Sequence, residues 1–478
     1  MDNWIKKQAA INPHRLAVDD GQTQYTFAQL ADVVGKLAGK LTRIPTSKTG
    51  RIAIETTNSM AGYLMALAVL ASGHTIVWLN SRLAFEELQR QLDDAQVAAL
   101  LVSDELSVGQ FSVPTYQFAT IFAMPVRDSV MVPRFNDESV ASIMYTSGTT
   151  GAPKGVLQTF KNHFSSAVAS ALNLGLTPTD EWLCTVPIFH ISGFSIMMRG
   201  LIYGMAVRLV PSFDADKIHQ ILVTEPVTMI SVVPYMLRRL LNVRETTQQA
   251  YNRQFRGMLL GGGPIDRPTL QRCTKLQLEV VQSYGMTETC SQIIALNNAD
   301  ADAEIGSVGK PLFLTELKLA VDGEVLLKTP ALTPGYLNRP EALANKMVDG
   351  WYRTGDIGHF DQNDFLFIDG RKDDMIISGG ENIFPNEVEA AYATFEGLSE
   401  IAVVKQFDPK WDQVPVAFYV AAKAIPEAKL IAYGRQHLAH YKVPKAFHQV
   451  EKLPVNAGGK VQRYKLMALL EQKPLDDG

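Results

Sequence analysis

The chain has 478 residues, of which 46% are hydrophobic and 20% charged, and its formal net charge is −4. This composition is typical of a globular protein and excludes a disordered or fibrous one, while the length predicts more than one domain. The slight negative charge leaves no excess of cations for the phosphates of nucleic acid or for acidic lipid, so neither is an expected partner.

The cysteines and the apolar segments predict a cytoplasmic protein. Cys184, Cys273 and Cys290 are odd in number and form no CxxC pair, so neither a disulfide framework nor a zinc site is expected. The first residues, MDNWIKKQAAINPHR, lack the apolar core of a secretory signal. The stretch 63–79 is too short for a transmembrane helix and predicts a buried helix, a glycine stop at Gly73 and a strand. A homo-oligomer is compatible with the sequence, which does not fix the oligomeric state.

Short β-rich apolar runs alternate with helical patterns along most of the chain. This rhythm predicts parallel strands with helical crossovers, and therefore an α/β fold: a large N-terminal body of parallel or mixed sheets flanked by helices. The alternation resumes from residue 207. The first runs that carry it are the strands at 51–55, 74–79 and 98–103 and the helices at 60–71 and 84–95.

From about residue 303 the pattern changes to short strands and turns. The Asp-Gly pairs in VDGEV (321–325) and IDGRK (368–372) predict tight turns between antiparallel strands. The last hundred residues combine helical and strand patterns, which is enough for a small α+β domain. We therefore expect an N-terminal domain at 1–372, with a β-rich subdomain at about 303–372, and a C-terminal domain at 373–478.

The stretch MYTSGTTGAPKG (144–155) follows a predicted strand and predicts a phosphate-binding loop. Successive backbone N–H groups form an anion-binding nest, glycine allows close approach, and the lysine adds a positive charge. The candidate residues are Thr146, Ser147, Gly148, Thr149, Thr150, Gly151 and Lys154. The loop is not a Walker A motif, because every Gly-Lys pair in the chain is followed by Leu, Pro or Val. GxSxG and HExxH motifs are also absent, which argues against common hydrolases and metalloproteases.

Five motifs in this order resemble the adenylate-forming superfamily of acyl- and aryl-CoA synthetases, nonribosomal adenylation domains and luciferases. They are YTSGTTGAPKGV, SYGMTETC (283–290), YRTGDIG (352–358), GRKDDMIISGGENIFPNEVE (370–389) and LPVNAGGKVQR (453–463). The resemblance covers essentially the whole chain. It implies that ATP, Mg²⁺ and CoA are used to convert a small carboxylic acid into an acyl-adenylate and then into a thioester.

The second of these motifs suits a reaction that joins anions, because such a reaction must screen negative charge and hold groups in line. In SYGMTET we expect Tyr284 to stack on adenine and Thr287 to donate to the α-phosphate. Glu288 is the expected Mg²⁺ ligand.

The ribose and the adenine ring have candidate partners of their own. Asp356 is expected to accept hydrogen bonds from both ribose hydroxyls, and by resemblance Arg371 assists it. In LLGGGPI, Gly262 and Gly263, with Gly261 before them, are expected to let the backbone lie flat against the adenine. A simple strand-to-helix turn is the alternative for these glycines.

Two stages are implied by resemblance for the C-terminal domain. In the first, Lys460 bridges the substrate carboxylate and the α-phosphate. In the second, the mobile domain rotates about a hinge at Asp373, withdraws Lys460, and brings Gly379 and Gly380 beside the active site to leave room for the pantetheine arm of CoA. Asp374 follows the hinge position, so either carboxylate could carry the pivot.

The acid substrate must be read from the pocket. The stretch VPIFHISGFSIMMRGLIYGM (186–205) resembles the 2-succinylbenzoate–CoA ligases of menaquinone biosynthesis, whose substrate carries a second carboxylate. We expect a loop with His190, Ser192 and Gly193 to line an aromatic-sized pocket, Phe194 to form an apolar wall and Arg199 to supply charge. A packing role is the alternative for His190, and a solvent-facing position is the alternative for Arg199. The candidate catalytic residues are therefore Lys460, Thr287, Glu288 and His190.

Three rival functions predict different observations. A ligase for another aryl or medium-chain acid would share every motif and differ only in its substrate panel. A nonribosomal amino-acid adenylation unit would be followed by a carrier domain and would need a pocket Asp for the α-amine. A catalytically silent nucleotide-binding regulator would lack Lys154, Glu288, Asp356 or Lys460, and all four are present.

Overall fold

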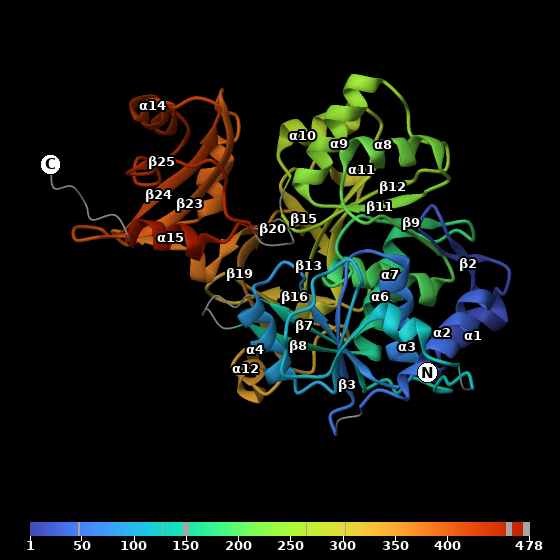
Figure 1. Ribbon diagram of the computed structural model, residues 1–478. Coiled ribbons are helices and arrows are strands. Elements are labelled where there is room, and N and C mark those ends of the chain that lie inside the picture. Colours follow the sequence, from blue (N-terminus) through green and yellow to red (C-terminus); the bar gives the residue numbers. More distant parts are fainter. Residues whose placement is uncertain are drawn as a thin grey trace.

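The computed structural model describes residues 1–45, 48–126, 128–146, 153–263, 265–301, 303–455 and 461–471 (Figure 1). Within them the strands form sheets of 14, six and five strands. The predicted α/β class is confirmed, with helices on the sheets of a large body and a smaller α+β unit at the C-terminal end (Figure 1). In this part of the chain, no helix is both long enough and apolar enough to cross a membrane.

The strands on either side of the predicted phosphate loop, β7 and β8, lie at one edge of the six-stranded sheet. Its order is β6-β5-β3-β4-β7-β8, parallel except for the antiparallel pair β7 and β8. Its strands are β3 (Arg51–Glu55), β4 (Thr75–Leu79), β5 (Ala99–Val102), β6 (Thr115–Gln117), β7 (Val140–Thr146) and β8 (Lys154–Thr159). The helices beside them are α2 (Phe27–Leu41), α3 (Met60–Ala71), α4 (Phe85–Ala95) and α5 (Phe118–Ala123).

Both faces of this sheet are buried, which explains its uninterrupted apolar strands. Ile52 and Ile54 of β3 belong to the core that contains α2 and α3, whereas Ala53 belongs to the core that contains Leu88 and Leu92 of α4. Figure 1 shows α4 on one side of the strands and α2 and α3 on the other. The predicted helix, glycine stop and strand at 63–79 are confirmed by α3, a left-handed glycine turn and β4.

The largest sheet joins parallel and antiparallel strands in one surface. Its order is β16-β17-β19-β20-β15-β14-β13-β12-β11-β9-β10-β1-β2, and β18 pairs with β19. The strands are β1 (Leu16–Asp19), β2 (Gln24–Thr26), β9 (Glu181–Cys184), β10 (Ala206–Leu209), β11 (Met229–Val232), β12 (Gly257–Leu260), β13 (Val280–Met286), β14 (Ser291–Leu296), β15 (Ser307–Pro311), β16 (Glu316–Leu319), β17 (Glu324–Lys328), β18 (Met347–Val348), β19 (Trp351–Phe360) and β20 (Leu366–Arg371). The β-rich segment therefore extends the body's sheet through β14, β15 and β20.

The helices that accompany this sheet carry the predicted substrate residues and cover its strands. They are α1 (Trp4–Ile11), α6 (Phe160–Leu174), α7 (Ile191–Tyr203), α8 (Ala215–Thr224), α9 (Pro234–Thr247), α10 (Arg267–Lys275), α11 (Asn298–Ala301) and α12 (Pro340–Ala344). Two short 3₁₀ helices, η1 (Thr287–Thr289) and η2 (Lys372–Asp374), lie at functional motifs.

The C-terminal residues form the five-stranded sheet and two cores of their own. Its elements are β21 (Ile376–Ser378), β22 (Glu381–Ile383), α13 (Pro385–Tyr392), β23 (Leu398–Asp408), β24 (Asp412–Ala421), α14 (Glu427–His437), β25 (Phe447–Gln449) and α15 (Arg463–Glu471). In Figure 1 this unit, in orange and red, stands beside the body and follows it in the chain after β20.

One of the two predicted Asp-Gly turns is confirmed and the other is wrong. Gly323 has φ +77° in the turn between β16 and β17, as expected. Gly370 instead lies within β20 and pairs with Ile357 of β19. A Cβ on Gly370 would come within 2.9 Å of Phe384, so close packing rather than a turn requires glycine here.

Candidate active site

The two residues that flank the predicted phosphate loop pair across a hairpin. Thr146, the last residue of β7, pairs with Lys154, the first residue of β8. The Lys154 ammonium lies over the ring of Tyr336, with Nζ 5.8 Å from the ring centroid. The predicted loop residues Ser147, Gly148, Thr149, Thr150 and Gly151, and the predicted catalytic Lys460, lie outside the described residues.

The two predicted ribose residues, Asp356 and Arg371, meet the predicted adenine residue Tyr284; Asp356 is buried, and the other two are partly buried. The Asp356 carboxylate accepts a hydrogen bond from the Tyr284 hydroxyl at 2.5 Å and an ion pair from Arg371 Nε at 2.7 Å. Adjacent strands β19 and β20 place Asp356 directly opposite Arg371. Burial, and then the negative charge of Asp356, raise the pKa of Tyr284, so its phenol remains a donor. The structure thus connects three of the predicted residues.

Glu288 lies in η1, between β13 and β14. Its Oε1 accepts a hydrogen bond from the Tyr336 hydroxyl at 2.9 Å, and its carbonyl accepts one from the Thr333 backbone at 2.7 Å. Thr289 Oγ1 accepts a hydrogen bond from the Met286 backbone N–H at 3.1 Å and stabilises the turn. Within the described residues, Oε2 of Glu288 accepts no hydrogen bond, which leaves this oxygen available to a cation.

A chain of hydrogen bonds from Gln158, Ser142 and His163 holds the backbone of Thr287. The Gln158 amide donates to the Thr287 carbonyl at 2.9 Å, and its Oε1 accepts from the Ser142 hydroxyl at 2.7 Å. The Ser142 hydroxyl is 3.0 Å from His163 Nε2, and because its one proton goes to Gln158, the histidine donates. Strands β7 and β8 and helix α6 thus position the α-phosphate candidate Thr287.

Acidification is expected to weaken the fold through His163. Burial, and then the nearby Arg199, lower the pKa of His163 to about 3. The folded state therefore keeps a neutral imidazole, whereas the unfolded chain takes up a proton below pH 6.5. The free energy of unfolding should fall by about 1.4 kcal/mol per pH unit below that value. Urea unfolding at pH 7 and pH 5 should show this loss, and H163Q should reduce it; an identical pH dependence in H163Q would contradict this assignment.

The predicted pocket residues lie differently from the expectation. Ser192, Gly193 and Phe194 belong to the first turn of α7 and not to a loop, while His190 is the residue before the helix. A Cβ on Gly193 would lie 2.3 Å from the carbonyl oxygen of Pro187, so glycine permits the helix to begin against the preceding segment.

The remaining pocket candidates differ in exposure. Phe194 is fully buried, with ring contacts to Trp78 at 5.3 Å and His163 at 5.1 Å, whereas Ser192 is exposed. His190 Nε2 is a buried nitrogen without a hydrogen-bond partner among the described residues, and burial lowers the pKa of His190 to about 4. His190 is therefore a neutral group that can still accept or donate one hydrogen bond.

Asn58 was not predicted and holds the segment that carries His190. Its side chain donates to the Val186 carbonyl at 2.9 Å and accepts from the Ile188 backbone at 2.9 Å. The residue is buried between β3 and α3, so two sheets of the body meet at this amide. Its only sequence signal is a polar residue after a buried strand.

Arg199 is buried, so the alternative of a solvent-facing position is wrong. It is 1% exposed, stacks over Trp182 at 5.3 Å and donates to the Ser291 hydroxyl at 3.3 Å. Its Nε and Nη1 have no close hydrogen-bond partner among the described residues; burial lowers the pKa of Arg199, and the nearby Tyr203 hydroxyl partly offsets this shift. A buried guanidinium without a carboxylate partner is costly unless an anion completes it.

Three of the predicted glycines have positive φ angles, which other residues rarely adopt. Gly262 has φ +84°, Gly379 φ +59° and Gly380 φ +90°. A Cβ on Gly379 would come within 2.7 Å of the Trp411 ring, while nothing lies within 4 Å of one on Gly380. The turn between β21 and β22 therefore requires both glycines for backbone reasons, whatever else they do.

At the predicted hinge, the two neighbouring aspartates have different partners. Asp374 forms an ion pair at 3.7 Å with Arg463 of α15. The Asp373 carbonyl accepts a hydrogen bond from Lys405 Nζ at 2.8 Å. Both residues are thus attached to the C-terminal unit, Asp374 by its side chain and Asp373 by its backbone carbonyl, which leaves only the Asp373 side chain without a described ion pair there.

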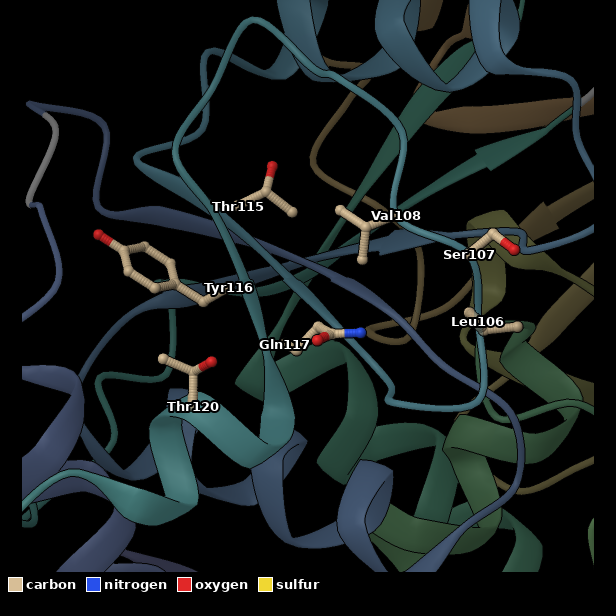
Figure 2. A pocket seen from close by; sticks show the side chains of 7 residues that line it. All are labelled: Leu106, Ser107, Val108, Thr115, Tyr116, Gln117 and Thr120. Atoms are coloured by element: carbon tan, nitrogen blue, oxygen red, sulfur yellow. The ribbon is translucent and has the colours of Figure 1, made fainter.

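A surface hollow of about 440 Å³ lies elsewhere, at the free edge of the six-stranded sheet (Figure 2). It is lined by Leu106, Ser107, Val108, Thr115, Tyr116, Gln117 and Thr120. None of the predicted site residues contributes to it. This hollow is therefore not part of the predicted site.

Two family models match the chain. The AMP-binding enzyme family matches residues 5–337, and the AMP-binding enzyme C-terminal domain matches residues 387–460. The 2-succinylbenzoate–CoA ligase of Listeria monocytogenes serotype 4b (strain F2365) is 45% identical over 466 residues, which are 98% of this chain and 99% of that protein.

Solved structures of o-succinylbenzoate CoA synthetase from Bacillus subtilis have the same fold. The complex with the acyl-adenylate intermediate OSB-AMP has a TM-score of 0.92 and 37% identity over 98% of both chains. The complex with ATP and magnesium ion has a TM-score of 0.92 and 36% identity over 98% and 99% of the chains. A double mutant bound to the product analogue OSB-NCoA has a TM-score of 0.76 and 36% identity over 98% of both chains. The chain therefore belongs to the AMP-binding enzyme family of AMP-forming acyl-CoA ligases and, within it, to the 2-succinylbenzoate–CoA ligases.

Proposed function

We propose that this protein activates 2-succinylbenzoate with ATP and transfers it to CoA in menaquinone biosynthesis. The succinyl carboxylate attacks the α-phosphorus of ATP, pyrophosphate leaves, and an acyl-adenylate forms. The sulfur of CoA then attacks the acyl carbon, AMP leaves, and 2-succinylbenzoyl-CoA is released. The 45% identity with a 2-succinylbenzoate–CoA ligase over nearly the whole chain supports this assignment.

The residues around Glu288 and Asp356 take the nucleotide roles. Glu288 would hold Mg²⁺, which supplies charge neutralisation on the phosphates; a single carboxylate suits this ion, since Mg²⁺ in such sites is usually held by one or two carboxylates with substrate phosphates and water. No group of three or more His, Cys, Asp or Glu side chains with metal-ligand geometry occurs in the described part of the chain, which agrees with such a site. Asp356 and Arg371 would bind the ribose, and Thr287 would donate to the α-phosphate.

The phosphate loop and the adenine site complete the nucleotide site. Thr146 and Lys154, with the loop between them, would bind the phosphates. Gly262 and Gly263 would lie against the adenine, and Tyr284 would cover it while its hydroxyl stays on Asp356.

Arg199 is the observation that carries the choice of acid. A fully buried guanidinium with two unpartnered nitrogens suits a substrate that brings its own carboxylate into the pocket. We assign Arg199 to the ring carboxylate of 2-succinylbenzoate and His190 to a second polar contact with the acid. A monocarboxylic aryl or medium-chain acid would leave this charge buried and unpaired.

An Arg199→Met variant tests this assignment. Removing the cation should raise KM for 2-succinylbenzoate by about 10- to 100-fold, because a hydrogen bond to a charged group is lost. The KM for 4-oxo-4-phenylbutanoate, which lacks the ring carboxylate, should change little. Folding should be retained, since an apolar residue replaces a buried charge. Pyrophosphate release over both acids, benzoates and fatty acids measures the preference; equal effects on both keto acids would contradict this role.

The domain organisation follows from the same function. Residues 1–372 would form the AMP-binding domain and residues 373–478 a mobile domain that turns about Asp373, with Lys460 serving the first step and Gly379 and Gly380 the second. The two separate family matches support this division. A cytoplasmic location and assembly into a homo-oligomer complete the proposal, and the three buried free cysteines agree with a reducing compartment.

A further inference from the structure

A buried chain of hydrogen bonds runs from Glu288 to a lysine that lies in none of the five motifs. Tyr336 donates to Glu288 Oε1 at 2.9 Å, the hydroxyls of Tyr336 and Tyr352 are 3.2 Å apart, and Lys346 Nζ donates to the Tyr352 hydroxyl at 3.3 Å. Tyr336 is 4% exposed and Tyr352 is fully buried, so the phenols are shielded from water. Lys346 is half-buried just before β18 and lies over the Tyr352 ring, 5.2 Å from its centroid.

The groups at the two ends decide which hydroxyl donates in each of these hydrogen bonds. An ammonium group can only donate and an ionised carboxylate can only accept. The proton of Tyr352 therefore points to Tyr336, and the proton of Tyr336 points to Glu288.

We propose that Tyr336, Tyr352 and Lys346 are positioning residues for the adenylation step. They fix one oxygen of Glu288, direct the other toward the metal and nucleotide, and bring a positive charge near the site without a direct ion pair that would compete with Mg²⁺. This inference rests on the proposed role of Glu288 as the Mg²⁺ ligand.

Tyr336 also connects the two halves of the phosphate site. Its hydroxyl holds Glu288, while its ring lies under the ammonium of Lys154. The backbone of the same segment is joined to β8, since Leu337 donates to Gly155 at 2.7 Å and Val156 bridges to Tyr336. One side chain thus sets the relative positions of the expected metal ligand and the expected phosphate lysine.

The two functions of this side chain can be separated by substitution. Y336F removes only the hydroxyl and keeps the ring under Lys154, whereas Y336L removes both. In Y336F we expect the Mg²⁺ concentration for half-maximal ATP–pyrophosphate exchange to rise by about tenfold, since one hydrogen bond to a charged group is lost. In Y336L we expect KM for ATP to rise as well. Thioester formation from supplied 2-succinylbenzoyl-adenylate and CoA should stay within about twofold in both.

Lys346 is tested at the far end of the chain. K346M should shift the Mg²⁺ dependence in the same direction as Y336F, and K346R, which keeps a cationic donor, should restore it toward wild type. Tyr392 offers the matched control, because it is a fully buried phenol that donates to the Leu430 carbonyl at 3.0 Å in the C-terminal unit. Y392F should leave the Mg²⁺ dependence unchanged.

The outcomes separate this inference from the proposed function. If the wild-type protein gives no pyrophosphate exchange with 2-succinylbenzoate, the proposed function fails. If wild type is active but Y336F and K346M keep the wild-type Mg²⁺ dependence, the positioning role alone is overturned. Equal losses in both half-reactions would also overturn it, because a purely structural role predicts that result.

Discussion

Replacing Glu288 with glutamine is expected to lower ATP–pyrophosphate exchange by about 10²- to 10³-fold, the loss typical when a preorganised charge-stabilising group is removed. Glutamine keeps the shape of the side chain and can still accept from Tyr336 through its carbonyl oxygen. It then presents an NH₂ group, not an anionic oxygen, where Oε2 of Glu288 now lies. The nucleotide phosphates would lose their protein-held metal, and the attack of the carboxylate on the α-phosphorus would slow.

The same variant should separate the two half-reactions. Thioester formation from supplied acyl-adenylate and CoA involves no triphosphate, so E288Q should retain most of it. The matched control is E181Q, a buried glutamate at the start of β9 whose pKa burial raises to about 7, so that a neutral amide resembles its protonated form. Its exchange rate should stay within about twofold of wild type. Retention of full exchange activity in E288Q would show that another group holds the metal.

Local sequence signals predicted the elements that carry the site. The apolar run at 51–55 became β3 because both of its faces are buried, and the polar residues after β7 begin the predicted loop. The family resemblance implied a contact that spacing alone could not predict: Asp356 and Arg371 pair across β19 and β20. The contact between these two charged residues was therefore expected before the fold was known.

Long-range packing decided what the sequence did not predict. The Asp-Gly pair at 369–370 has the composition of a turn, but pairing along β19 and contact with Phe384 keep it in a strand. Arg199 resembles a residue of a solvated helix face, yet α7 is enclosed and buries it. Tyr336 reaches Glu288 only because the β-rich segment folds back over η1, a contact between residues 48 positions apart that no local pattern encodes.

The comparison with one relative in two liganded forms bears on the proposed domain rotation. The Bacillus subtilis complexes with acyl-adenylate and with product analogue have nearly the same identity to this chain, 37% and 36%, and the same coverage of 98%. Their TM-scores nevertheless differ, at 0.92 and 0.76. Sequence divergence cannot explain that difference. This chain superposes more fully on the acyl-adenylate complex than on the product-analogue complex, a difference that a second arrangement of the C-terminal domain would produce.

Two variants that should each slow a different half-reaction test for this second arrangement. K460A should lower pyrophosphate exchange on the order of 10³-fold, because the proposed cation between two anions is lost, and should leave thioester formation from supplied adenylate nearly intact. D373P should do the reverse, because proline fixes φ at the pivot and restricts the residue before it. D374N, which weakens only the pair with Arg463, serves as the control for the pivot. Parallel losses of both half-reactions in K460A and D373P would mean that one fixed arrangement performs both steps, since only alternation assigns the two residues to different stages.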